Sequence, residues 1–232
     1  MTACCLYYTA HRHPPEIEAA CRAQLDKARG DIPLVAVGLQ PFDYGDVTVI
    51  LGGLEPGPLT LHKQILAGLR LIAAEWVYFC ENDVLYHPSH FEPMAGRRHN
   101  AFHYNTNIWR VRYDDGHVVW TDDLEQTSGL CAHRNLLLEH YARRVGEIER
   151  NGFNRHYEPG PKTSRWQVDR WQSRYPNLDI RHNRTMTRSK WDPSEFRNQR
   201  YAAGWREADE VGGWGPTKPI MDAIREGRYG AE

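Results

Sequence analysis

The sequence predicts an α/β fold, in which a mostly parallel sheet is flanked by helices and followed by an irregular C-terminal tail. Apolar runs of strand length alternate with helix-period segments over the first eighty residues. Apolar residues make up 41% of the chain and charged residues 25%, which is typical of globular proteins and argues against a disordered, collagen-like or coiled-coil chain. The length of 232 residues suits one large core with appended segments.

The first eighty residues predict three strands and two helices in alternation. Continuous apolar runs indicate strands over residues 3–9, 32–37 and 76–80. The helix-like segment 14–29 begins at a Pro-Pro step and ends before a glycine, and segment 61–72 has apolar residues at helical spacing. A loop-rich interval with a short apolar run lies between the second strand and the second helix. This order favours a parallel sheet wrapped by helices.

The second half of the chain predicts less regular structure. Residues 101–111 and 117–121 are expected to form a hairpin around an Asp-Asp-Gly turn. Helices are expected over residues 136–148 and 167–174, and a last strand over residues 178–181. The remainder has little periodicity, and its Gly-Gly-Trp-Gly-Pro run argues against regular structure. We therefore expect one α/β domain over residues 1–190, with residues 191–232 as a tail that packs on it or covers it.

The net charge of −1 conceals an uneven distribution. Residues 1–130 carry 10 basic and 16 acidic groups, residues 131–206 carry 16 and 8, and residues 207–232 carry 3 and 6. The middle segment, at +8, also interleaves arginine and lysine with aromatic residues. Such a segment is suited to contact phosphates while its rings stack on bases or sugars. Two alternatives stay open: the phosphates belong to a diphosphate or to a nucleic acid, or the segment is a solvated surface.

Cysteine usage and hydropathy predict a cytoplasmic protein. The five cysteines are odd in number and form no Cys-x-x-Cys pair, so neither a disulfide framework nor a thiolate zinc site is indicated. The N-terminus lacks the pattern of a signal peptide, and the most apolar stretch, residues 66–80, is interrupted by Arg70 and Glu75. We expect neither secretion nor a membrane partner. The oligomeric state is left open.

The clearest candidate for chemistry is Glu81-Asn82-Asp83, directly after the predicted strand 76–80. In an extended backbone residues 81 and 83 point to the same side, with α-carbons about 6.6 Å apart. Open α/β sheets bind ligands at the carboxyl ends of their strands, and hard carboxylate oxygens suit Mg²⁺ or Mn²⁺. The alternative is that Asp83 only caps a turn.

These residues, with two other segments, resemble the GT-A-type glycosyltransferases. A first strand ending in Tyr7-Tyr8-Thr9-Ala10-His11-Arg12 is followed by a helix and then by an acidic motif that closes a hydrophobic strand. The family's metal motif is written DXD, and here glutamate replaces the first aspartate. The segments Cys80-Glu81-Asn82-Asp83-Val84-Leu85-Tyr86 and Asp179-Ile180-Arg181-His182-Asn183 are similar to small single-domain phage and bacterial members. The resemblance covers residues 3–190 in motif order.

The resemblance implies a metal site and a nucleotide site. Asp83 binds Mn²⁺ or Mg²⁺ directly, Glu81 contacts the donor's ribose or reaches the metal through water, and His182 is a second metal ligand. Basic neighbours on both sides of His182 favour its neutral, ligating form. Lys63 and Gln64 start a helix and reach the donor, or else they belong to a solvent-facing surface. The nucleotide-sugar site is expected to comprise Tyr8, Thr9, Ala10, Arg12, Lys63, Gln64, Asn82, Arg184 and Arg188, with Lys190 as a further cation.

The resemblance also implies a general base and an acceptor pocket. A transferase that inverts configuration needs a base for the acceptor hydroxyl, and Glu158 holds the family's position, with Asp169 as the alternative. A retaining enzyme needs none, and the stereochemistry is left open. The acceptor pocket is expected to involve Asp122, Asp123, Trp109 and Trp166.

Together these features predict a metal-dependent glycosyltransferase that moves a sugar from a nucleotide-sugar, expected to be UDP-linked, to an acceptor hydroxyl. The phage-like resemblance and the basic segment favour a hydroxymethylated pyrimidine in DNA, and hence the host cytoplasm as location, with the base flipped or single-stranded. A small-molecule, glycan or protein acceptor is the alternative. From other classes, a non-catalytic nucleotide-sugar or nucleic-acid binding module and a metal-dependent nuclease stay open. The sequence lacks the usual serine-hydrolase, P-loop and zincin motifs.

Overall fold

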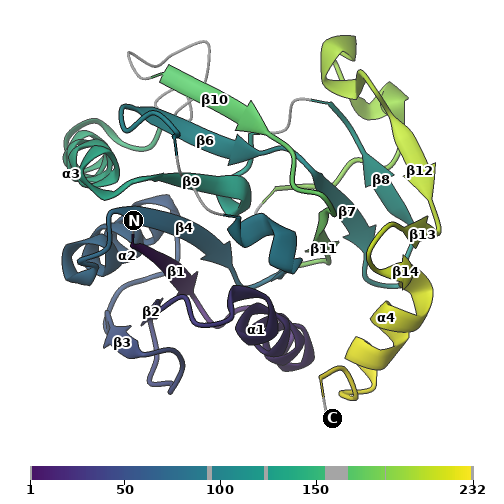
Figure 1. Ribbon diagram of the computed structural model, residues 1–232, viewed down its shortest axis with the longest axis horizontal. Helices are drawn as coiled ribbons and strands as arrows, with labels where there is room; N and C mark the ends of the chain where they lie inside the picture. Colours follow the sequence, from purple (N-terminus) through teal and green to yellow (C-terminus); the bar gives the residue numbers. More distant parts are fainter. Residues whose placement is uncertain (1, 93–95, 123–124, 155–166, 186, 231–232) are drawn as a thin grey trace.

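A computed structural model describes residues 2–92, 96–122, 125–154, 167–185 and 187–230 of the chain. It is a mixed α/β structure built on a large, mostly parallel sheet flanked by helices, which confirms the predicted fold class. A smaller second sheet lies beside the large one (Figure 1). No helix among the described residues is long and apolar enough to cross a membrane.

The central sheet has seven strands in the order β10-β6-β9-β4-β1-β2-β3, stacked from top to bottom in Figure 1. Strands β4, β1, β2 and β3 run parallel to one another, and so do β10 and β6. Strand β9 is antiparallel to both of its neighbours. The strands are β1 (Ala3–Thr9), β2 (Leu34–Gly38), β3 (Val47–Ile50), β4 (Trp76–Glu81), β6 (Ala101–Asn105), β9 (Leu130–His133) and β10 (Gln167–Trp171).

Helices cover both faces of the central sheet because alternate side chains of its buried strands point to opposite faces. Leu6 and Phe79 pack on α2 (Pro58–Leu71) and α3 (Arg134–Asn151). Tyr7 and Cys80 face the other way, toward the second half of α1 (Pro15–Arg29). The first half of α1 packs on the second sheet, so this helix joins the two sheets.

The second sheet has five strands in the order β12-β8-β7-β11-β5. One face packs its apolar side chains on α1 and on the last helix, α4 (Thr217–Arg225). A two-stranded pair, β13 (Glu210–Val211) and β14 (Gly215–Pro216), precedes α4. The strands of the second sheet are β5 (Val84–Leu85), β7 (Ile108–Arg112), β8 (Val118–Trp120), β11 (Asn177–Arg181) and β12 (Arg206–Ala208).

The secondary structure differs from the prediction in the second half of the chain. The expected helix over 167–174 is wrong, because residues 167–171 form strand β10 beside β6. The expected strand over 101–111 is two strands, β6 and β7, which belong to different sheets. The hairpin is correct for β7 and β8. The tail, expected to be irregular, contains α4 and the short strands β12 to β14.

Candidate metal centre

Two neighbouring strand ends create the candidate site. After β1 the chain builds β2 and β3 on one side, and after α2 it returns to form β4 on the other side of β1. This reversal of strand order is the place where open α/β sheets bind ligands, outside the carboxyl ends of the strands. Tyr8 is in register with Glu81, so β1 and β4 end at the same level. Residues that follow Thr9 and Glu81 therefore lie at one edge of the sheet.

The second sheet brings a third segment to this edge. Strand β5 begins immediately after Asp83 and pairs antiparallel with β11, with Val84 opposite Asp179. The backbone N–H of Ile180 donates a hydrogen bond of 2.8 Å to the carbonyl of Asp83. His182 follows the end of β11, so antiparallel pairing carries it back past Asp83.

His13, Asp83 and His182 form the candidate metal centre. One ligand atom from each of the three side chains lies within 4.8 Å of the others. This is close to the roughly 4.3 Å between two ligands on opposite sides of one divalent ion. The two imidazole rings have centroids 4.6 Å apart at an interplanar angle of 88°. Among the described residues it is the one group of three or more potential ligands that could hold a metal.

Unpartnered nitrogens support this assignment. Nδ1 of His13 and Nε2 of His182 are buried and have no hydrogen-bond partner within the described part of the chain. The other ring nitrogen of His182, Nδ1, accepts a hydrogen bond of 3.2 Å from the backbone N–H of Arg184. Buried polar atoms normally have partners, so two imidazole nitrogens without a hydrogen-bond partner beside a carboxylate are suited to bind a cation.

The electrostatics favour neutral imidazoles. Burial, with the nearby His13, Arg181 and Arg184, lowers the pKa of His182 to about 4. Burial also lowers the pKa of His13, although Glu18 and Asn82 act in the opposite direction. Burial raises the pKa of Asp83, against the effect of Arg181. Without a cation this carboxylate is therefore poorly stabilised, whereas both imidazoles have their lone pairs available at neutral pH.

Glu81, predicted as a metal contact, lies beside the cluster but is not one of its three members. Its Oε1 accepts a hydrogen bond of 3.0 Å from the hydroxyl of Tyr8. Burial, Asp83 and Asp179 raise the pKa of Glu81, and the Tyr8 hydrogen bond and Arg181 oppose this rise. Tyr8 itself is 4% exposed, which leaves little of its ring surface accessible.

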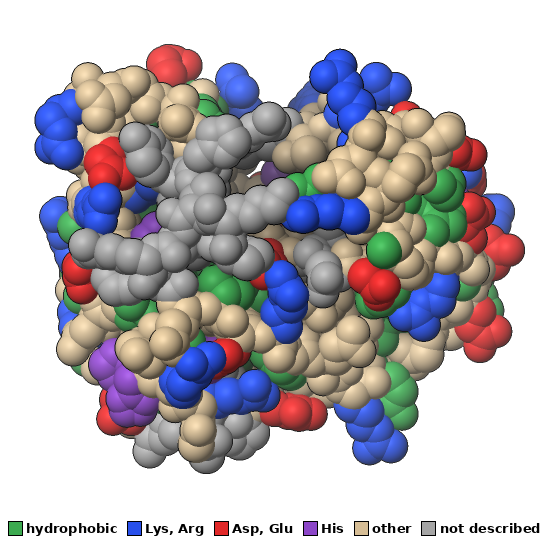
Figure 2. Space-filling model, turned by 90° about the horizontal axis from the view of Figure 1, so that it is seen from above, with side chains coloured by type: hydrophobic (Ala, Val, Ile, Leu, Met, Phe, Trp, Pro, Cys, Tyr) green, Lys and Arg blue, Asp and Glu red, His purple; other side chains and the backbone are tan. Residues whose placement is uncertain are grey.

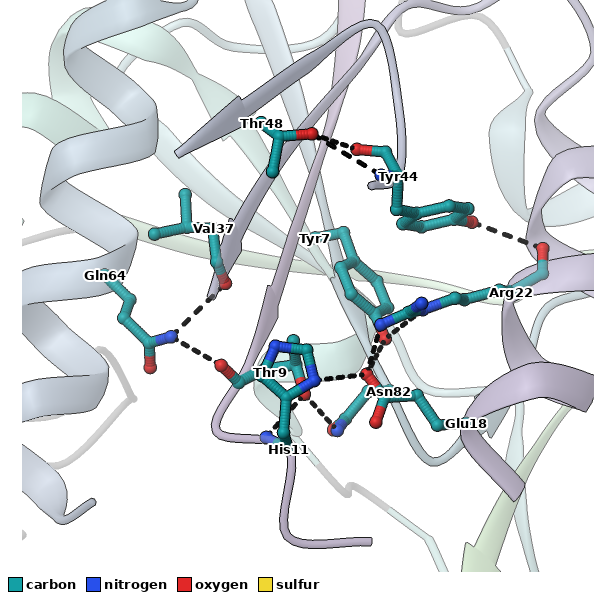
Figure 3. Close-up of polar contacts among 10 residues, drawn as sticks. All are labelled: Tyr7, Thr9, His11, Glu18, Arg22, Val37, Tyr44, Thr48, Gln64 and Asn82. Atoms are coloured by element: carbon teal, nitrogen blue, oxygen red, sulfur yellow. Dashed lines mark hydrogen bonds and ion pairs between the residues drawn. The ribbon is translucent and has the colours of Figure 1, made fainter. Parts of the chain in front are cut away.

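The loop that carries His13 is held by the hydroxyl of Thr9 (Figure 3). Thr9 Oγ1 accepts hydrogen bonds from the backbone N–H of His11 and from Asn82 Nδ2, at 3.0 and 2.8 Å. Gln64 Nε2 donates to the carbonyls of Thr9 and Val37, at 2.7 and 3.2 Å. Asn82 and Gln64, predicted to bind the nucleotide-sugar, are thus buried and tie the strand ends together.

His11 is anchored on its other side by α1 (Figure 3). Its Nδ1 lies 3.4 Å from Oε1 of Glu18, which also accepts hydrogen bonds from Tyr7 and Arg22. His11 has a φ of 52°, a left-handed conformation that costs energy for a residue with a Cβ. The Thr9 and Glu18 contacts hold the backbone in this turn, which directs the following residues back toward Asp83.

The other predicted donor-site residues have varied surroundings. Ala10 lies in the same loop and is half-buried. The carbonyl of Arg12 accepts a hydrogen bond of 3.0 Å from Nη1 of Arg184, which joins the His13 loop to the segment after His182. Lys63 pairs with Glu149 of α3 at 2.8 Å. Arg188 is exposed and lies 3.4 Å from Glu195.

The predicted base and acceptor residues are only partly within the described structure. Glu158, Asp123 and Trp166 lie outside the described residues. Asp169 is on β10, where the ion pair with Arg98 lowers the pKa of its carboxyl.

Two other residues predicted to contact the acceptor lie within the described structure. The Asp122 side chain packs against Gly204 in the C-terminal segment. Trp109 is half-buried and packs against the core of the second sheet, with the Arg206 guanidinium 5.9 Å from its ring centroid.

Sequence analysis did not single out His13 as a ligand. The available signal was its position four residues beyond the first strand, in His11-Arg12-His13, at the edge where the acidic motif also ends. Because these three polar residues are consecutive, the sequence does not show which of their side chains points toward Asp83.

No family model matches the chain, and no curated protein does. Among solved structures it is similar to a glycosyltransferase involved in the glycosylation of the major capsid of PBCV-1. That likeness has a TM-score of 0.46 and 11% identity, over 74% of this chain and 82% of that one. It is also similar to the bifunctional IspDF of Campylobacter jejuni, with a TM-score of 0.38 and 7% identity, over 75% of this chain and 50% of that one.

Proposed function

We propose that this chain is a metal-dependent glycosyltransferase that moves a sugar from a nucleotide-sugar, UDP-linked, to an acceptor hydroxyl. The observation that carries the proposal is the group of His13, Asp83 and His182 at the edge where β1 and β4 end. Open α/β sheets bind ligands at this edge. A divalent cation held there is in place to bind the diphosphate of a nucleotide-sugar.

The donor set favours Mn²⁺ over Mg²⁺. Two imidazoles and one carboxylate suit a transition metal, whereas Mg²⁺ prefers oxygen ligands alone. Fe²⁺ and Zn²⁺ suit the same set, so the metal is best identified by elemental analysis of purified protein. When bound, the ion supplies electrostatic stabilisation for the negative charge of a departing diphosphate.

The chain's own residues have three roles in this proposal. Arg184 is exposed beside the metal ligands and supplies positive charge for the diphosphate. Thr9 and Asn82 hold the His13 loop in place. The rings of His11 and Phe42, with centroids 4.8 Å apart, pack over Gly38 at the end of β2 and offer an aromatic edge for the nucleobase.

Transfer with inversion needs a base, and Glu158 remains the proposed residue. Asp169 is the weaker candidate because its ion pair with Arg98 lowers the pKa of its carboxyl and so reduces its basicity.

For the acceptor we propose a hydroxymethylated pyrimidine in DNA. The observation that favours it is the excess of basic side chains in residues 182–206, which carry 6 basic and 2 acidic groups, most of the basic ones exposed. Arg184, Arg197, Arg200 and Arg206 are exposed, and no carboxylate lies within 4.0 Å of their guanidinium groups among the described residues. The yellow-green segment at the top right of Figure 1 belongs to this part of the chain, and Lys and Arg side chains are spread over both halves of the face drawn in Figure 2.

The donor reaction gives the first test. The purified chain, incubated with a panel of nucleotide-sugars and Mn²⁺, should slowly release free sugar from one of them. Asp83→Ala should abolish this release, whereas Asp209→Ala, which removes a carboxylate whose side chain is 97% exposed, should not change it. Donor binding without turnover, indifferent to Mn²⁺ and to Asp83→Ala, would instead indicate a non-catalytic binding module.

Modified DNA gives the second test. Incubation of the chosen donor with DNA containing hydroxymethylated pyrimidines, followed by mass analysis of the nucleosides, should show one added sugar per modified base. Retention on DNA should weaken steeply with salt, by a logarithmic slope of about −0.9 for each phosphate contact in duplex DNA. Strand breaks without a mass increase would indicate a nuclease, and salt-insensitive retention without transfer would rule out DNA as the acceptor.

A further inference from the structure

The second sheet has one apolar face and one charged face. Val111, Leu178 and Ile180 belong to the apolar cluster shared with α1 and α4. The residues between them in sequence point the other way. Arg110 is in register with Asp179 on the neighbouring parallel strand, and Arg181 follows two residues later on the same face.

These three charged side chains form a row in which Arg110 and Asp179 are buried and Arg181 is half-buried. Nη2 of Arg181 lies 2.7 Å from a carboxylate oxygen of Asp179, and Asp179 is 4% exposed. Arg110 is 6% exposed, and its Nη2 donates a hydrogen bond of 3.3 Å to Oγ1 of Thr121. No carboxylate oxygen of a described residue lies within 4.0 Å of the Arg110 guanidinium.

The row begins at the candidate metal centre. Val84, next to Asp83, pairs with Asp179, and His182 directly follows Arg181. The charges of Asp83 and Asp179 both raise the pKa of Glu81, and the charge of Asp83 raises the pKa of Asp179, so these three carboxyl groups are close enough to interact. From Asp83 the row therefore runs through Arg181 and Asp179 to Arg110, away from the end of β1.

Two hydrogen-bond donors in the row are unused. Nε of Arg110 and Nε of Arg181 are buried without a partner among the described residues. An ordinary structural ion pair satisfies its donors, because a buried donor without a partner is costly. Two guanidinium donors left open beside a carboxylate acceptor match a ligand that both donates and accepts hydrogen bonds at neighbouring positions.

We propose that Arg110, Asp179 and Arg181 form the subsite for the hydroxyl groups of the sugar that is transferred. This inference rests on the proposed function, since it places the sugar next to the cation that holds the diphosphate. A sugar with adjacent hydroxyls accepts hydrogen bonds from the guanidinium groups and donates to the carboxylate. An ionised diphosphate has no proton to donate to Asp179, so the carboxylate in the row is matched by a hydroxyl group and not by a phosphate oxygen.

The test compares a nucleotide-sugar with its nucleotide. The probes are UDP, UDP-glucose, UDP-galactose and UDP-N-acetylglucosamine, each titrated calorimetrically in the presence of Mn²⁺. Arg110→Lys keeps the positive charge but removes the planar Nε donor, and Asp179→Asn keeps the shape but removes the acceptor charge. Arg112→Lys is the matched control, because Arg112 is on the same strand and face but pairs with Asp115.

The expected result is a selective loss of the affinity that the sugar adds to nucleotide binding. For Arg110→Lys and Asp179→Asn the ratio of UDP-sugar affinity to UDP affinity falls about tenfold, while UDP affinity and its dependence on Mn²⁺ stay unchanged. The control leaves both affinities unchanged. Unaltered UDP binding also shows that each variant is folded.

Three outcomes overturn the inference, and they differ from one another. If UDP and UDP-sugars weaken equally in both variants, the row has only a structural role. If neither ligand is affected, the row does not contact the donor. If the wild-type chain binds none of the probes in a Mn²⁺-dependent way, the proposed function fails as stated and this inference fails with it.

Discussion

Replacing His13 by alanine is expected to weaken Mn²⁺ binding about a hundredfold while leaving the fold intact. His13 contributes one of the three potential ligands, and its Nδ1 is buried without another partner among the described residues. A four-ligand zinc site supplies roughly 10–16 kcal/mol, or about 3 kcal/mol per ligand, which corresponds to roughly a hundredfold in affinity.

The metal-free variant should be about as stable as the wild type. Alanine removes the contact of the His13 ring with His182, but it also removes a buried nitrogen that has no partner. An unsatisfied buried group costs about 1–3 kcal/mol, so the two changes offset each other. For a chain of this size we expect the midpoint of thermal unfolding to shift by less than about 4 °C without metal.

Thermal unfolding with and without Mn²⁺ measures the effect. At a Mn²⁺ concentration of 100 times the wild-type Kd, binding stabilises the wild type by about 2.7 kcal/mol, and a variant with hundredfold weaker affinity by only about 0.4 kcal/mol. His99→Ala is the control, because His99 is exposed and stacks on His133, beyond the amino end of β4. If His13→Ala gains as much stability from Mn²⁺ as the wild type, His13 is not a ligand.

Three further predictions follow from the same contacts. Thr9→Val removes the hydroxyl that accepts hydrogen bonds from His11 and Asn82, and it should lower Mn²⁺ affinity about tenfold. A calorimetric titration measures this affinity, and an unchanged value would show that the hydroxyl does not position the loop that carries His13. Because burial raises the pKa of Asp83, Mn²⁺ should displace protons when it binds at pH 6. This release is measured as a dependence of binding heat on the ionisation enthalpy of the buffer, and equal heats in all buffers at pH 6 would contradict it. Burial lowers the pKa of His90 to about 3, below the unfolded value near 6.5, so the neutral imidazole stabilises the fold above pH 6.5. About 4 kcal/mol of the free energy of unfolding is therefore lost as the pH falls from 6.5 toward 3. Urea unfolding of His90→Gln should show a smaller loss of stability over this pH range than the wild type, and an equal loss would refute the prediction.

The sequence predicted β1, α1, α2 and β4 because their patterns are local. Strands β1 and β4 are continuous apolar runs buried on both faces, and α1 and α2 have apolar stripes that such a sheet requires. Strand β10 was missed because it is an edge strand whose first four residues are exposed or half-buried, so its apolar pattern is weak. Its pairing with β6 is a non-local contact that decides the conformation against the local pattern.

Local sequence patterns did not predict the division into two sheets, for a different reason. Most of residues 101–111 are buried, both in β6 of the central sheet and in β7 of the second sheet. Hydropathy therefore does not show that the chain changes sheet between these two strands. Buried polar contacts hold this change in place. Asn105 donates to Ser173 at 2.9 Å and accepts from the backbone N–H of Asn107 at 3.0 Å. In the sequence these residues are only polar interruptions.

The candidate site follows from that second sheet more than from the acidic motif. A carboxylate at the end of β4 is predictable, because apolar strands that end in acidic residues are a local feature. His182 reaches Asp83 only because β5 turns the chain antiparallel to β11, and β5 is two residues long. His13 reaches the same point because β1 and β4 are parallel neighbours in register and because the turn at His11 redirects the chain. The third ligand thus depends on one strand pairing and one left-handed residue, neither of which hydropathy reports. For this reason Thr9→Val and His13→Ala together separate the two causes: the first disturbs the turn and leaves the ligand, and the second removes the ligand and leaves the turn.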